Sequence, residues 1–132
     1  MTDKLPETNL FDFGGSFFPS DSVVAFFNSE ADANAVKTEV NTRLPAARCE
    51  VFSPKKVHEW ASDGLANAGF IASLGYGIKI VEKHEALSKA GKWSIIAHVP
   101  GESGTEIAMT AIRKKVFFQA NKYNTVTVED LS

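Results

Sequence analysis

Residues 23–33 read VVAFFNSEADA, and this stretch decides the fold class. Its first five residues form a continuous apolar run, which is typical of a strand buried on both faces. Ser29 then supplies a helix N-cap, and Glu30 and Asp32 fall in the first turn, where the helix dipole favours acids. A buried strand that leads directly into a helix begins a βα unit.

The following residues complete this unit. Apolar side chains recur at spacings of three and four between Ala33 and Leu44, which predicts a helix with one buried stripe. Pro45 helps to end that helix, because proline removes a backbone donor. Residues 47–52, ARCEVF, alternate apolar with charged side chains, as a half-exposed strand does.

The same order returns late in the chain. Residues 93–99, WSIIAHV, predict a strand, and Ser103 with Glu106 has the spacing of a capping box. We expect the apolar face of the next helix to run from Ile107 to Val116 and the chain to leave that helix by Asn124. Residues 125–128, TVTV, alternate strictly and predict a closing strand.

Two βαβ units predict an α+β fold with a ferredoxin-like split βαβ sheet of four antiparallel strands. The first and third strands are apolar on both faces and belong in the centre, so Val24 and Ile96 are expected in adjacent strands. This arrangement leaves one face of the sheet bare. We expect a helical insertion between the second and third strands, residues 53–92, to cover that face.

The insertion opens with Ser53 as an N-cap and Pro54 at the first helical position. A ridge of small residues, Gly64, Ala68 and Ala72, would let another backbone come close. Residues 75–77, GYG, are expected to divide the insertion into two helices. Its polar residues argue against a membrane span, which needs about 20 apolar residues.

The rest of the chain fits one domain. Residues 1–21 mix Pro and Gly with four phenylalanines and predict an extended arm that docks on the domain itself or on a partner subunit. Residues 22–132 are expected to form a single α+β domain. The net charge of -2 is not that of a nucleic-acid binder, and one cysteine without a leader sequence predicts a cytoplasmic protein.

The opening stretch, the small-residue segment 64–77 and the strand at 93–99 together resemble the heat-induced or general stress protein domain of bacteria, over roughly residues 22–128. This resemblance implies a small accessory protein without enzymatic activity, and it supplies no catalytic residues. The middle segment departs from the family's glycine-rich stretch in being less apolar, which argues against membrane association.

The three histidines, His58, His84 and His98, have no ligand spacing with one another, so no metal and no cofactor is expected. His98 lies late in a predicted central strand, and either fills the sheet face or acts as an acid, base or ligand contact. We predict a small-ligand site between sheet and insertion, lined by Trp60, Tyr76 and His98.

Other motifs have plainer interpretations. The loop at 100–106 could attract anions at a helix start, but it lacks a P-loop lysine and carries acids, so capping is the better reading. The basic run at 113–115, with Lys122, is interpreted as a solvated helix face, and the aromatics Phe117, Phe118 and Tyr123 are placed on that helix rather than on strands. RNA binding is thus a distant third hypothesis. Cys49 is expected to be a buried, inert thiol.

The sequence therefore predicts a non-catalytic, stress-related accessory domain that acts by self-association or by binding a protein partner or a small ligand. A homo-oligomer is expected, with a dimer as the first expectation, and with no nucleic acid bound. The alternative is a small ferredoxin-like enzyme with a pocket between sheet and insertion, in which His98 is the acid or base and Trp60 and Tyr76 are the walls.

Overall fold

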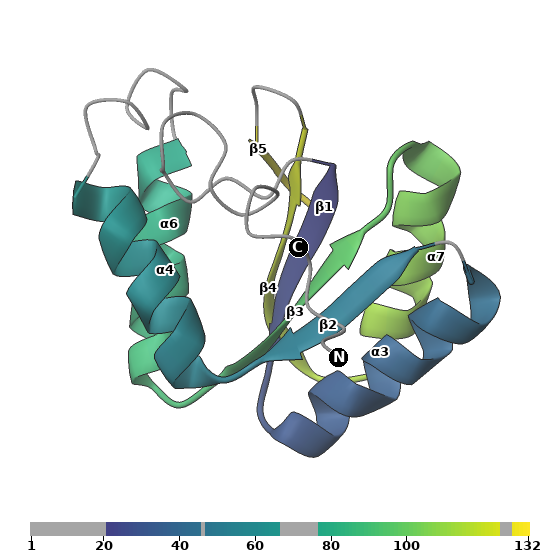
Figure 1. Ribbon diagram of the computed structural model, residues 1–132, viewed down its shortest axis with the longest axis horizontal. Helices are drawn as coiled ribbons and strands as arrows, with labels where there is room; N and C mark the ends of the chain where they lie inside the picture. The colour runs from purple at the N-terminus through teal and green to yellow at the C-terminus, as the bar shows by residue number, and fades with distance from the viewer. Residues whose placement is uncertain (1–20, 46, 67–76, 125–127) are drawn as a thin grey trace, which may run out of the picture.

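The computed structural model describes residues 21–45, 47–66, 77–124 and 128–132, which form one antiparallel sheet with helices on both faces (Figure 1). Four helices and five strands lie within these residues, so the fold is α+β, as predicted. In chain order they are β1 (Ser22–Phe27), α3 (Glu30–Arg43), β2 (Arg48–Phe52), α4 (Pro54–Ala66), α6 (Gly77–Lys89), β3 (Trp93–His98), α7 (Glu102–Ile112), β4 (Phe117–Tyr123) and β5 (Val128–Asp130).

The strands are arranged in the order β2-β3-β1-β4-β5, so the first strand of the sequence is the middle strand of the sheet. Val24 of β1 pairs with Ile96 of β3 on one side and with Asn121 of β4 on the other. The predicted adjacency of the strands of Val24 and Ile96 is therefore confirmed. All six residues of β1 are buried, which explains its continuous apolar run.

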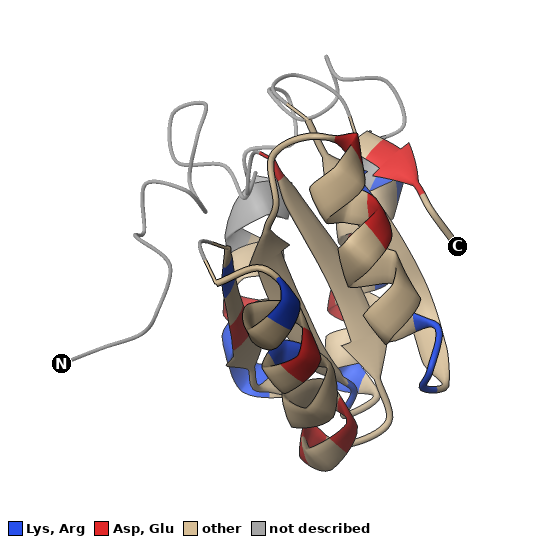
Figure 2. Cartoon of the chain, turned by 90° about the vertical axis from the view of Figure 1, so that its right-hand side faces the viewer, with Lys and Arg blue, Asp and Glu red and all other residues tan. Residues whose placement is uncertain are grey.

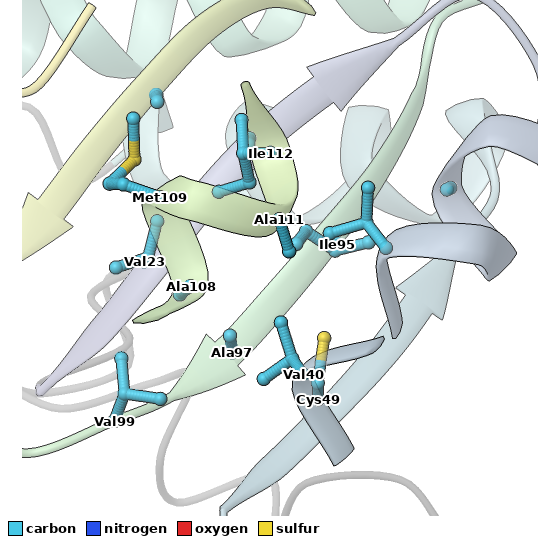
Figure 3. Close-up of a cluster of buried hydrophobic side chains, with 14 of the residues drawn as sticks. Val23, Val40, Cys49, Ile95, Ala97, Val99, Ala108, Met109, Ala111 and Ile112 are labelled. Atoms are coloured by element: carbon cyan, nitrogen blue, oxygen red, sulfur yellow. The ribbon is translucent and has the colours of Figure 1, made fainter. Parts of the chain in front are cut away.

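The two faces of the sheet carry separate apolar cores. Helices α3 and α7 cover one face, where Ala108, Met109 and Ile112 of α7 pack near Val23 of β1 (Figure 3). Helices α4 and α6 cover the other face, where Trp60 and Val81 belong to the same cluster as Val24 and Ile96. Successive side chains of a strand point to opposite faces, so alternate residues of the same strand belong to the two different cores.

Two of the predicted helix starts are confirmed. Ser29 Oγ accepts a hydrogen bond from the Asp32 backbone nitrogen at 3.2 Å, and Ser53 Oγ accepts one from the Lys56 nitrogen at 3.3 Å. The predicted capping box at Ser103 is wrong, because the N-cap of α7 is Gly101, two residues earlier, and it has no side-chain cap. Gly101 has φ 90°, a left-handed conformation that glycine tolerates.

The segment 117–123 was expected to be helical, and this prediction is wrong. Helix α7 ends at Ile112, Val116 is 64% exposed instead of packing in a helix stripe, and residues 117–123 form β4. Pairing with β1 and β5 on its two sides stabilises this strand in spite of its weak intrinsic preference. Of its aromatics, Phe118 is exposed and Tyr123 is fully buried, so they form no open stacking surface.

The sheet also has five strands where four were expected, since β5 adds a short strand beside β4. Of the four residues predicted as the closing strand, 125–127 lie outside the described residues and only Val128 is in β5. The insertion between β2 and β3, residues 53–92, was expected to contain two helices divided at residues 75–77. The helices described there are α4 and α6, and residues 67–76, which include Tyr76, Ala68 and Ala72, lie outside the description, as does the arm up to residue 20.

Candidate functional site

The predicted site residues occupy different places. Trp60 is 5% exposed in the core under α4, where its ring meets the Phe52 ring edge-on with centroids 4.4 Å apart. His98 ends β3, half-buried, with Nδ1 3.4 Å from Ser22 Oγ. Phe52, which Trp60 contacts, pairs with Ser94 of β3, whereas His98 pairs with Arg48 at the other end of β2. Trp60 and His98 therefore lie over different parts of the sheet. Tyr76 lies outside the described residues, and the three-residue site stays a prediction.

A different group of polar side chains is buried on the same face of the sheet, under α6. Gln119, Asn121 and Tyr123 are alternate residues of β4, so their side chains project to one face, and His84 projects onto them from α6. None of the four is more than 4% exposed. We call these four residues the buried polar cluster.

His84 and Tyr123 form the firmest contact in the cluster. His84 Nε2 lies 2.9 Å from Tyr123 Oη, within hydrogen-bonding distance, and the His84 ring also packs on Phe26 with centroids 5.1 Å apart. Burial lowers the pKa of His84 to about 3, partly opposed by a hydrogen bond with Gln119. Burial also raises the pKa of Tyr123. Both side chains are therefore uncharged at neutral pH.

Asn121 is the anomalous member of the cluster. Its side chain is fully buried, yet neither its amide oxygen nor its amide nitrogen has a hydrogen-bond partner among the described residues. A buried polar group without a partner costs about 1 to 3 kcal/mol of stability, whereas an apolar side chain of similar shape costs nothing of the kind. Such a group in a folded protein calls for a specific reason, and a bound molecule that supplies the missing hydrogen bonds is one.

A second feature lies on the opposite face, where a cleft of about 410 Å³ opens beside the start of α7. Four carboxylates line it, from Asp21, Glu102, Glu106 and Glu129, and acidic residues are visible on α7 and β5 in Figure 2. The three glutamates are exposed, so water already solvates them.

The only lysine among the described residues that line this cleft is Lys122, which is 5% exposed. Its Nζ donates to the Val99 carbonyl at 2.7 Å and to Thr105 Oγ1 at 2.6 Å. Burial lowers the pKa of Lys122, while the charges of Asp21 and Glu129 raise it. Lys122 thus fastens β4 to the first turn of α7, and its assignment to a solvated helix face was wrong. Among the described residues that line the cleft, none carries an unpaired buried group that would select a ligand.

Comparisons of the chain with protein-family models, with curated proteins and with solved structures gave no match. Within the described ranges, no group of three or more His, Cys, Asp and Glu side chains is placed to hold a metal ion. No helix in that same part of the chain has the length and apolarity needed to cross a membrane. The buried polar cluster is therefore the candidate functional site among the described residues.

The sequence carried a signal for part of this cluster. His84 follows Ile80 and Val81 by four and three residues and precedes Leu87 by three, so it falls on the apolar stripe of α6, where a polar residue needs a partner. Gln119 and Asn121 could not be found in this way, because their segment was interpreted as a helix, and a helix would not place alternate residues on one face.

Proposed function

We propose that this chain is a non-catalytic binding domain that holds a small polar ligand between its sheet and helix α6, at Asn121. The observation that carries the proposal is the buried Asn121 carboxamide, for which the described residues supply no hydrogen bond. A ligand that pairs with it would remove a penalty of about 1 to 3 kcal/mol, which is a useful fraction of the stability of a small domain.

The cluster is better suited to binding than to proton transfer. A general acid or base works best when its pKa lies near the operating pH. The pKa of His84 is about 3, and that of Tyr123 is raised above the ordinary phenol value. Both side chains would keep the same protonation state throughout the physiological range and would act as fixed hydrogen-bonding groups.

A small enzyme with His98 as acid or base is the alternative. It is favoured by one contact, since His98 Nδ1 lies 3.4 Å from Ser22 Oγ, and a histidine beside a serine is the pair found in nucleophilic catalysis. Hydrolysis of p-nitrophenyl acetate would report such a pair. Under the binding proposal, His98→Gln leaves the background hydrolysis unchanged and alters the free energy of unfolding by about 1 kcal/mol. A rate that falls with His98→Gln in a folded protein would favour the enzyme.

We further propose a stress-related accessory role for the chain and a ferredoxin-like origin for its fold. The resemblance to bacterial stress proteins supports an accessory role, and the strand order β2-β3-β1-β4 supports a ferredoxin-like origin to which β5 is added. We also propose that the chain forms a homo-oligomer, of which light scattering at about 100 μM is the test, because even a weak complex assembles at that concentration. A strictly monomeric protein would contradict this part.

The binding proposal is tested with the ¹⁵N-labelled full chain and a set of small polar fragments. We expect at least one fragment to shift the Asn121 side-chain amide signals and the backbone signals of α6 and β4. Asn121→Leu should abolish the shifts of the backbone signals of α6 and β4 and raise the free energy of unfolding of the free protein by about 1 kcal/mol, because it removes an unpaired buried amide. Asn34→Leu, on an exposed position of α3, is the matched control. Binding that survives Asn121→Leu, or no binding by any fragment, would contradict the proposal.

A further inference from the structure

The chemical class of the ligand follows from the groups that Asn121 presents, and this inference rests on the proposed function. A carboxamide offers one acceptor oxygen and one donor nitrogen side by side. Both are buried and unpaired within the described residues. A single molecule that satisfies both must itself carry a donor and an acceptor side by side on one edge.

The same chain contains an example of such pairing. The Asn41 side chain on α3 donates from Nδ2 to the Cys49 carbonyl at 3.3 Å and accepts at Oδ1 from the Cys49 backbone nitrogen at 3.2 Å. There the complementary edge is a backbone N–H and C=O. The N–H and C=O of Cys49 belong to two neighbouring peptide groups, and together they form an uncharged edge with one donor and one acceptor. A carboxamide of this protein thus already pairs through both of its polar atoms with an edge of this kind.

Ionised groups fit the site less well. A carboxylate only accepts hydrogen bonds and an amidinium only donates them, so each would leave one polar atom of Asn121 unpaired. The described residues around Asn121 also supply no buried counter-charge, because His84 and Tyr123 are neutral and the cross-strand neighbour on β1 is Val24. Asp130, the neighbour on β5, is exposed, and its Oδ1 accepts from the Ser132 backbone nitrogen. An ion moved into this region would lose its hydration without gaining a partner.

We infer that the buried polar cluster binds an uncharged molecule with an amide-like edge, such as a primary carboxamide, a lactam or an imide, which pairs with the Asn121 carboxamide through both of its polar atoms. The apolar side chains of Val24 and Phe26 on the neighbouring strand favour an apolar remainder for this ligand.

Three probes of nearly equal size separate these cases: propionamide, propionate and the propionamidinium ion. We expect the full chain, followed by the backbone amide signals of α6 and β4, to bind propionamide at least about tenfold more tightly than either ion. Asn121→Leu should lose this binding, and the control Asn34→Leu should keep it. Asn121→Asp should move the preference toward propionamidinium, because the amidinium supplies the counter-charge that keeps a buried carboxyl group ionised, and an ionised carboxylate accepts and does not donate.

The outcomes distinguish the two proposals. If one of the ions binds as tightly as propionamide and Asn121→Leu abolishes its binding, the inferred ligand class is overturned while the proposed function stands. If other polar fragments bind at Asn121 but none of the three probes does, the ligand class is again overturned. If neither the probes nor any fragment binds, both proposals fall. Should Asn121→Asp not fold, the comparison of the three probes on the unaltered chain and on Asn121→Leu still decides.

Discussion

The side chain of Asn41 pairs with the backbone of Cys49 through both of its polar atoms, at 3.3 and 3.2 Å, and so joins helix α3 to the edge strand β2. Strand β2 pairs only with β3 among the described strands, and the carboxamide occupies backbone groups that a further strand would otherwise use. An edge strand covered in this way offers less of a template for pairing with another chain.

Replacement of Asn41 by Ala should therefore lower the free energy of unfolding by about 1 to 2 kcal/mol, because two hydrogen bonds are lost from a partly buried edge. Chemical denaturation monitored by circular dichroism measures this loss. Asn34→Ala, at an exposed position of the same helix, is the control and should change the stability by less than about 0.5 kcal/mol. Equal effects of the two substitutions would show that the pairing contributes nothing of its own.

Acid should destabilise the fold through His84. The pKa of this side chain is about 3 in the folded protein against an ordinary value of 6.5, because burial disfavours the charged imidazolium. Below about pH 6.5 the unfolded chain takes up a proton that the folded chain refuses. Stability is thus fully present above that pH and should fall by up to about 1.4 kcal/mol per pH unit until the pH approaches 3.

The contribution of His84 can be separated from that of other groups by comparing the chain with its His84→Gln variant. Between about pH 6 and 4, the unfolding free energy should change less steeply with pH in the variant than in the unaltered chain. The two slopes should differ by nearly the contribution of one proton, about 1.4 kcal/mol per pH unit. Identical slopes would mean that the imidazole is already charged in the folded protein.

Cys49 should be unreactive toward thiol reagents in the folded protein. It is buried, and burial, aided by the charge of Glu50, raises the pKa of its thiol to about 12, so that almost no thiolate exists at neutral pH. Ellman's reagent should modify the native chain at least about a hundredfold more slowly than the chain unfolded in guanidinium. A native rate close to the unfolded rate would contradict the burial of this thiol.

Lys122→Met should destabilise the protein although it preserves the length of the side chain. The substitution removes the hydrogen bonds to the Val99 carbonyl and to Thr105 Oγ1, so the unfolding free energy should fall by about 1 to 3 kcal/mol. Lys114→Met is the matched control, because the Lys114 ion pair with Glu39 at 2.8 Å is exposed and such pairs contribute less than about 1 kcal/mol. The reverse order of the two losses would show that Lys122 is dispensable.

The elements that could be predicted are those in which local pattern and tertiary environment agree. Strand β1 is apolar throughout because both of its faces are buried, and α3 has its cap at Ser29 and its stripe at Val36 and Val40. Strand β4 breaks this agreement. Its face toward α6 carries Gln119 and Asn121, which are polar although buried, so hydrophobic periodicity had nothing to detect.

The candidate site could not be predicted from the sequence, because its residues on β4 are polar although they are buried. A buried amide is unpaired when none of the segments folded around it supplies a hydrogen-bond partner. This depends on the tertiary structure and cannot be read from the local sequence. His98 was recognisable from its strand parity, but its neighbour Ser22 became apparent only with the register of β1 against β3.

The central position of β1 also governs the order in which the sheet can be built during synthesis. Its two neighbours, β3 and β4, begin at Trp93 and Phe117, so both are synthesised well after β1. Until then the described elements available to its apolar side chains are α3, β2, α4 and α6, without the strand on either side. Contacts between such distant residues make folding slow, and a nascent chain in this state is a natural client for chaperones that shield apolar segments.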